Sequence, residues 1–77
     1  MDKLQEARKI IDEVDTEMAQ LFARRMEAVE TVAAYKRDHG LPIFDAAREE
    51  EVIRNGEARM ERQGLRRHYG AFLRSTM

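Results

Sequence analysis

Apolar residues recur at alternating gaps of three and four along the first half of the chain, which is the spacing of one helix face. We call this set the apolar stripe; its positions, all apolar except Arg25, are Leu4, Ala7, Ile11, Val14, Met18, Leu21, Arg25, Ala28, Val32 and Tyr35. The pattern predicts one helix from Lys3 to about Asp38. It should stop there because His39-Gly40-Leu41-Pro42 supplies a glycine stop and a proline that cannot continue the helix.

A second helix is expected from Ala46 to about Arg62, with Asp45 as its N-cap. This stretch is rich in helix formers and carries a weaker apolar pattern, interrupted by Gly56, before Gln63-Gly64 is expected to end it. The members of that pattern are Ala46, Val52, Ile53 and Met60.

A third, short helix is expected after Gly64 and should still be running when the chain stops. Its apolar or small residues at helical spacing are Leu65, Tyr69, Phe72, Leu73 and Thr76. Gly70 lies inside it and should weaken it by about 1 kcal/mol relative to alanine. Nothing in the sequence reads as a strand, so the predicted fold class is all-α, with one long helix and two shorter ones.

The length of the first helix predicts a dimer. At 1.5 Å per residue it spans roughly 50 Å, whereas a compact globule of this size is about 30 Å across. A chain of 77 residues forms one domain at most, and a domain this small buries only about 60% of its unfolded surface. We therefore expect residues 1–77 to form one helical domain that is covered by a second copy, as an intertwined homodimer.

Composition narrows the classes of function. Hydrophobic residues make up 43% of the chain, which is enough for a core, and the net charge is −1. Acidic and basic residues are interleaved, so no nucleic-acid partner is expected. No apolar run approaches the roughly 20 residues of a membrane span, and the start MDKLQEARKI lacks the apolar core of a signal peptide. We expect a cytoplasmic protein without a membrane partner.

Neither a cofactor nor a metal is expected from the sequence. The absence of cysteine excludes disulfides, thiol catalysis and thiolate metal sites. His39 and His68 are isolated and have no metal-ligand spacing, and the glycines are too scattered for a phosphate loop.

Two cations on the first helix are candidates for binding an anion. Arg25 occupies a position of the apolar stripe, where a guanidinium is costly unless it is paired. Lys36 follows eleven residues later, within about 20° of the same direction and some 16 Å along the axis. Together they flank Val29 and Val32, with no acid between them on that side. The structural alternative for Arg25 is a packed stem whose head reaches water.

Charged residues also gather where the second helix begins. Asp45, Arg48 and Glu49 are expected on one face of its first turn. The structural alternative is an N-cap followed by a solvated charged turn. Arg8 is likewise open to a structural explanation, as a surface pair with Asp15.

Four fragments, in this order, resemble the all-helical chorismate mutase family between about residue 4 and residue 73. They are A-R-K-I-I-D-E-V-D from Ala7, R-R-M-E-A-V from Arg24, Y-K ending at Lys36 and L-P-I-F-D-A-A-R-E-E from Leu41. The resemblance implies an isomerase that converts chorismate to prephenate in aromatic amino-acid biosynthesis, without a cofactor, in a homodimer whose sites are shared between subunits.

The resemblance also implies roles for individual residues. Arg8 would enter the active site of the other subunit, where it and Arg25 would each bind one substrate carboxylate. Lys36 would stabilise the ether oxygen, Glu49 would accept a hydrogen bond from the ring hydroxyl, and Asp45 would fix the turn. Arg48 matches a charged position that supports the site. The family's third helix carries a serine and, one turn later, a glutamine or glutamate; the chain ends at Met77, before both, so a truncated third helix is expected.

Two alternatives stay open at this stage. An isochorismate-pyruvate lyase shares the helical scaffold and its arginines, but by resemblance it does not keep the acid pair represented here by Asp45 and Glu49. A non-catalytic regulatory or dimerisation domain of a larger aromatic-pathway protein is the other alternative, and the missing end of the third helix supports it.

Overall fold

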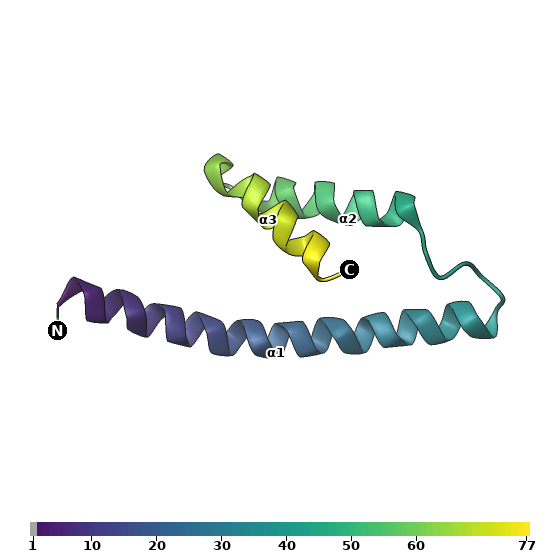
Figure 1. The fold of residues 1–77 in the computed structure, drawn as a ribbon, viewed down its shortest axis with the longest axis horizontal. Coiled ribbons are helices and arrows are strands. Elements are labelled where there is room, and N and C mark those ends of the chain that lie inside the picture. Colours follow the sequence, from purple (N-terminus) through teal and green to yellow (C-terminus); the bar gives the residue numbers. More distant parts are fainter. Residues whose placement is uncertain (1) are drawn as a thin grey trace. The chain divides into compact units, whose positions relative to one another are not determined.

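The computed structural model describes residues 2–77, and these residues form three α-helices and no strand. They are α1 (Lys3–Asp38), α2 (Ala46–Arg59) and α3 (Gln63–Ser75), as Figure 1 shows. The predicted all-α class, with one long helix and two shorter ones, is confirmed. The chain divides into two compact units, Met1–Ile43 and Phe44–Met77, and each is described by itself.

Both ends of α1 are closed by specific hydrogen bonds. The Asp2 side chain is the N-cap and accepts a bond from the Gln5 backbone N–H at 2.8 Å. At the other end Gly40 takes a φ of 63°, the left-handed conformation that glycine adopts without strain. The Gly40 N–H bonds to the Arg37 carbonyl at 3.3 Å and the Leu41 N–H to the Lys36 carbonyl at 2.8 Å. These two bonds make a Schellman motif, so the predicted glycine stop is confirmed.

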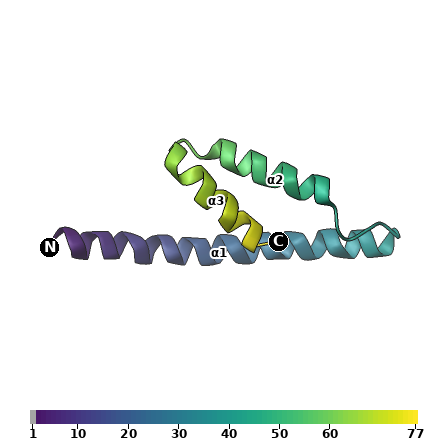
Figure 2. The same ribbon diagram turned by 45° about the horizontal axis from the view of Figure 1, so that its top comes forward.

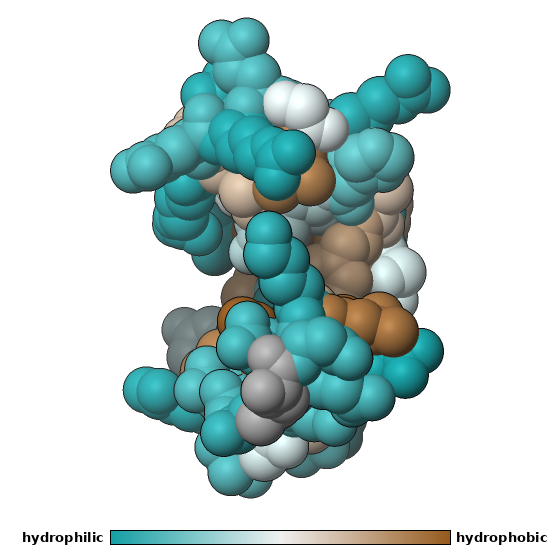
Figure 3. Space-filling model, turned by 90° about the vertical axis from the view of Figure 1, so that its left-hand side faces the viewer, coloured by the Kyte–Doolittle hydropathy of each residue, from teal (hydrophilic) through white to brown (hydrophobic). Residues whose placement is uncertain are grey.

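No side chain of α1 is buried. Figure 3, which looks along α1 from its N-terminal end, shows apolar side chains gathered on one side of the helix. The large apolar residues of α1 that remain exposed are Leu4, Ile10, Ile11, Val14, Met18, Leu21, Phe22, Val29, Val32 and Tyr35. Large exposed apolar surfaces of this kind are typical of interaction sites.

The core of the second unit lies between α2 and α3, which fold back on each other (Figure 2). Ile53 of α2 is 4% exposed and Leu73 of α3 is 7% exposed. Gly56 and Gly70 are also buried. A Cβ on Gly56 would overlap Leu73 Cδ1, and a Cβ on Gly70 would overlap the Glu57 carboxylate. The two glycines, which the sequence marks only as weak points, therefore allow the helices to approach closely.

The turn between α2 and α3 is not where the sequence predicts it. The second helix ends at Arg59 rather than near Arg62, and Gln63 and Gly64 belong to the first turn of α3 instead of ending α2. Met60 and Arg62 both adopt extended backbone conformations. The Arg66 side chain then donates its Nε–H to the Met60 carbonyl at 2.8 Å and fixes the turn. The break follows from helix packing, since no glycine or proline lies at 60–62.

The end of α3 also differs from the prediction. The helix ends at Ser75, and Thr76 is its C-cap. The Thr76 hydroxyl donates to the Leu73 carbonyl at 2.7 Å, and the Ser75 hydroxyl donates to the Phe72 carbonyl at 2.6 Å. Such bonds satisfy carbonyl groups that the helix itself leaves without partners. Within residues 2–77, no helix has both the length and the apolar content that a membrane span requires.

The contact at Gly56 gives a stability prediction. We expect Gly56→Ala to lower the free energy of unfolding, because overpacking against buried Leu73 costs about 1–3 kcal/mol. This cost should outweigh the roughly 1 kcal/mol by which alanine favours a helix over glycine. Urea unfolding followed by far-UV circular dichroism, at one protein concentration, measures the difference.

Two other glycines serve as controls for that comparison. Gly64→Ala introduces a Cβ with no atom within 4 Å, so its stability should equal or exceed that of the parent chain. Gly70→Ala should be milder than Gly56→Ala, because only the end of the flexible Glu57 side chain has to move. A Gly56→Ala chain as stable as Gly64→Ala would contradict the packing described here.

Candidate functional site

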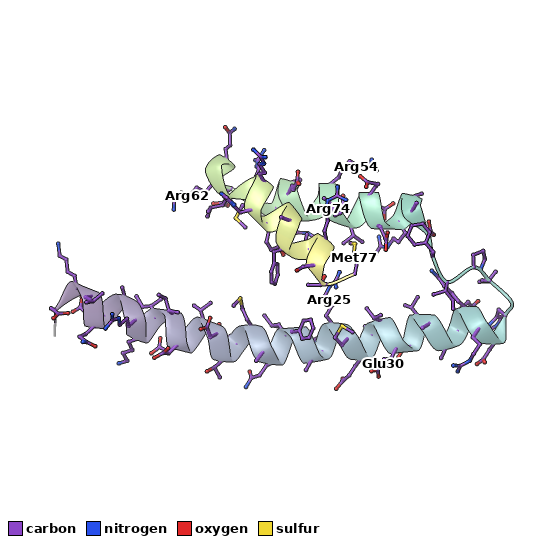
Figure 4. The ribbon with its side chains drawn as sticks, in the orientation of Figure 1. Arg25, Glu30, Arg54, Arg62, Arg74 and Met77 are labelled. Carbon is purple, nitrogen blue, oxygen red and sulfur yellow. The ribbon has the colours of Figure 1, made fainter. Side chains whose placement is uncertain are left out.

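The two cations expected to bind an anion lie on α1 and are half-buried. Arg25 and Lys36 are eleven residues apart, which places them about 16 Å apart along the helix axis and within about 20° of one direction. Glu30 lies between them in the sequence, but Figure 4 shows its side chain on the side of α1 opposite to Arg25. The side of α1 that carries the two cations is therefore free of that acid.

Lys36 has a defined contact with the loop that follows α1. Its Nζ donates a hydrogen bond to the backbone carbonyl of Ile43 at 3.2 Å. An ammonium group has three N–H donors, so this contact leaves two for another acceptor.

The apolar wall between the two cations is open in a single chain. Val29 and Val32 remain 43% and 52% exposed. Exclusion of water from this wall, which would strengthen nearby polar contacts, requires a cover on the apolar side of α1.

Arg8 does not join Arg25 within one chain. The two arginines are 17 residues apart on the same unbroken helix, which corresponds to about 25 Å along the axis and directions roughly 100° apart. Arg8 is exposed, and among residues 2–77 it forms no ion pair, so the structural alternative, a surface pair with Asp15, is not formed.

The first turn of α2 carries the predicted acids. Asp45 is the N-cap, as predicted, and its carboxylate accepts the Arg48 backbone N–H at 3.0 Å. The Glu49 N–H bonds to the Asp45 carbonyl at 3.1 Å, and the Glu49 side chain is half-buried. The Arg48 guanidinium instead pairs with Glu51 on the exposed surface of α2, an interaction of the kind that contributes little to stability.

Each unit thus holds a different part of the predicted site. The first unit carries the cations Arg8, Arg25 and Lys36, and the second carries Asp45, Arg48 and Glu49. Within residues 2–77 no group of three or more histidine, cysteine or acidic side chains is placed to hold a metal ion.

Two arginines that the sequence did not single out have structural partners in the second unit. Arg66 is half-buried and bonds to the Met60 carbonyl, and Arg74 lies 3.5 Å from a carboxylate oxygen of Glu50. Figure 4 shows Arg74 where α3 lies beside α2. No local sequence signal identifies Arg66, because its bond to Met60 depends on a turn that the sequence places elsewhere.

Comparisons with known proteins agree on one family. The family model described as chorismate mutase type II matches residues 7–74, a range that includes the five predicted site residues and the supporting Arg48. The T-protein of Haemophilus influenzae is 38% identical over 65 residues, which cover 84% of this chain and 17% of that protein. A protein named chorismate mutase from Methanocaldococcus jannaschii is 40% identical over 52 residues, which cover 68% of this chain and 52% of that protein. No solved structure matches the chain. The match to this chain covers about half of the Methanocaldococcus jannaschii protein and about a sixth of the T-protein.

The hydrogen bond of the Asp45 cap gives a second stability prediction. We expect Asp45→Ala to destabilise the chain by about 1 kcal/mol, the usual effect of losing an N-cap. Asp45→Asn keeps a side-chain oxygen that can accept the Arg48 N–H, so it should stay close to the parent chain in a thermal unfolding experiment. Equal loss in both variants would show that the carboxylate charge, rather than the cap, stabilises the start of α2.

Proposed function

This chain belongs to the chorismate mutase type II family, and from that premise we propose that it is an isomerase that converts chorismate to prephenate. The observation that carries the proposal is the pair of half-buried cations, Arg25 and Lys36, on the apolar side of α1. The substrate would be a dicarboxylate, and fixed cations beside an apolar wall are suited to bind it. We include in the proposal a cytoplasmic location, as expected from the sequence.

The reaction would be an intramolecular rearrangement. The ether carbon–oxygen bond breaks while a new carbon–carbon bond forms in the same molecule, so no atom is gained or lost and no external electron donor takes part. The enzyme has to hold the flexible substrate in a compact, chair-like geometry before the barrier is crossed.

Arginines would provide this restraint. A guanidinium matches a carboxylate with two parallel hydrogen bonds, so Arg25 would bind one substrate carboxylate. The second carboxylate would be bound by the partner subunit's Arg8, since Arg8 of the same chain lies about 25 Å from Arg25 along the helix.

Lys36 would act on the bond that breaks. Negative charge grows on the ether oxygen as the reaction proceeds, and a donor fixed near that oxygen lowers the barrier more than it stabilises the ground state. The Ile43 carbonyl accepts only one of the ammonium donors, which is compatible with this role.

Residues of α2 would complete the site. Glu49, half-buried in the first turn, would accept a hydrogen bond from the ring hydroxyl, and Asp45 would hold the turn through its N-cap bond to Arg48. Arg48 would contribute to the charged surroundings of the site rather than contact the substrate.

A homodimer is part of the proposal because it would cover α1. An antiparallel copy of α1 that crosses near Thr16 would bring its Arg8 level with Arg25, since the two positions are nearly equidistant from that crossing point. The exposed apolar residues of α1 support this arrangement, since a two-fold pair of helices can bury the same face of each copy.

An assay with the Lys36→Ala variant tests the activity and this role. The 77-residue chain should consume chorismate and form prephenate, identified by NMR. Lys36→Ala should lower kcat about a hundredfold or more, the effect of losing one fixed donor to a developing oxyanion, while KM changes little. Arg37→Ala, which removes the neighbouring exposed cation, is the control and should keep normal kinetics.

The same assay separates the alternative functions. A folded chain that releases pyruvate from isochorismate but leaves chorismate intact would be a lyase. A binding or dimerisation domain would be inactive on both substrates, as the 77-residue chain and also as a longer version with a complete third helix. Either result would reject the mutase proposal. Equal loss of kcat and of substrate binding in Lys36→Ala would reassign Lys36 to binding a carboxylate.

A mixing experiment tests the shared site. Arg8→Ala and Arg25→Ala homodimers should each be nearly inactive, because every site lacks one arginine. After subunit exchange, the mixed dimer would have one site with both substitutions and one site with neither, so its rate should approach half that of the parent dimer.

Native mass spectrometry provides the control by confirming that mixed dimers have formed. If they form without recovery of activity, each subunit would build its site alone. The placement of Arg8 in the partner's site would then be wrong.

A further inference from the structure

Lys36 is held at two points by the loop that follows α1. Its backbone carbonyl accepts the Leu41 N–H at 2.8 Å, and its side-chain ammonium donates to the Ile43 carbonyl at 3.2 Å. The loop after α1 therefore folds back on Lys36 and places the Ile43 carbonyl next to the ammonium at the end of the Lys36 side chain.

Backbone contacts, rather than buried side chains, fix the course of this loop. Ile43 and Phe44 are 71% and 70% exposed, so neither side chain anchors it. The loop is held instead by the Schellman bonds around Gly40, whose φ is 63°, and by Pro42, whose ring fixes φ near about −65°. The direction of the Ile43 carbonyl is consequently set by the backbone.

The partner of Lys36 leaves its charge intact. A carbonyl is neutral, and in the part of the chain that the structure describes no carboxylate forms an ion pair with Lys36. The adjacent Arg37 differs, because its guanidinium lies 3.7 Å from the Asp38 carboxylate. The contact with Ile43 thus restricts where the ammonium points while leaving its full charge and two donors for an anionic ligand.

We infer that the backbone carbonyl of Ile43 is a positioning group for Lys36, which aims the ammonium before the substrate arrives. The inference rests on the proposed function. A lysine side chain has about 2 kcal/mol of rotamer entropy to lose, and a lysine that is already restrained loses less of it when the transition state forms. The contribution of Ile43 should therefore appear in kcat and act only through Lys36.

A single-atom change in the backbone tests this inference. A chain made by chemical synthesis with an ester in place of the Ile43–Phe44 peptide bond keeps every side chain, but the ester carbonyl of Ile43 is a weaker hydrogen-bond acceptor. We expect kcat to fall about fivefold, the size of one ordinary hydrogen bond, with KM nearly unchanged. In a Lys36→Ala background the same ester should have no further effect.

The neighbouring bond supplies a matched control. An ester in place of the Pro42–Ile43 bond weakens the Pro42 carbonyl, which accepts no hydrogen bond among the described residues, and it should leave kcat unchanged. Three results would each overturn the inference. The two esters could lower kcat equally, the Ile43–Phe44 ester could lower KM, or that ester could lower kcat as much in the Lys36→Ala background as in the parent chain. If the Ile43–Phe44 ester reduces helix content, the Pro42→Gly variant, whose loop is less restrained, takes its place. Its effect on kcat is then compared in the parent chain and in the Lys36→Ala background.

A measurement without substrate separates this inference from the proposed function. The measurement is the rate at which a small acylating reagent modifies Lys36, followed by mass spectrometry with exposed Lys9 as the internal reference. This rate should rise severalfold in the Ile43–Phe44 ester. An unchanged rate overturns the positioning role even if the chain is an active mutase. Absence of prephenate formation by the parent chain would overturn the proposed function, and the acylation rate would still report on the contact.

Discussion

The apolar side of α1 is the constraint on which the rest of the molecule depends. The helix has 36 residues and buries none of them, while the only buried large apolar side chains in the described part of the chain are Ile53 and Leu73, in the other unit. Burial of apolar surface is the main favourable contribution to folding. A chain that leaves this much apolar surface exposed can gain further stabilisation by burying it against another surface.

The bounds of α1 could be predicted from the sequence because several local signals agree. The heptad-like spacing runs to Tyr35, and the glycine at position 40 and the proline at position 42 follow it, so all three place the end of the helix close to Asp38, where it lies. The boundary between α2 and α3 could not be predicted in the same way. The break at Met60 has no breaker residue, whereas Gly56 and Gly64 resemble breakers and lie inside helices. There, the packing of Leu73 over Gly56 decides the structure, and a residue-by-residue propensity does not include it.

The candidate site was predictable in its residue types but only partly in its contacts. The Asp45 cap involves residues three apart, so the local sequence is sufficient to predict it. The bond between Lys36 and the Ile43 carbonyl depends on the course of the loop, which is set by the left-handed Gly40. The separation of Arg8 from Arg25 follows from helix geometry alone, and it means that one chain cannot bring both arginines to one small ligand.

The proposed assembly and the proposed site depend on each other through the cost of removing charge from water. In a single chain Arg25 and Lys36 stand beside exposed Val29 and Val32, where water can solvate them. A partner helix that covers this wall buries apolar surface, which favours association, but it also removes water from the two cations, which opposes it. A dicarboxylate bound between the cations would offset that cost, because its charges replace the lost hydration. The same cover would lower the local dielectric and strengthen each contact to the ligand. Under the proposed function, binding of the substrate and pairing of the subunits would therefore stabilise each other.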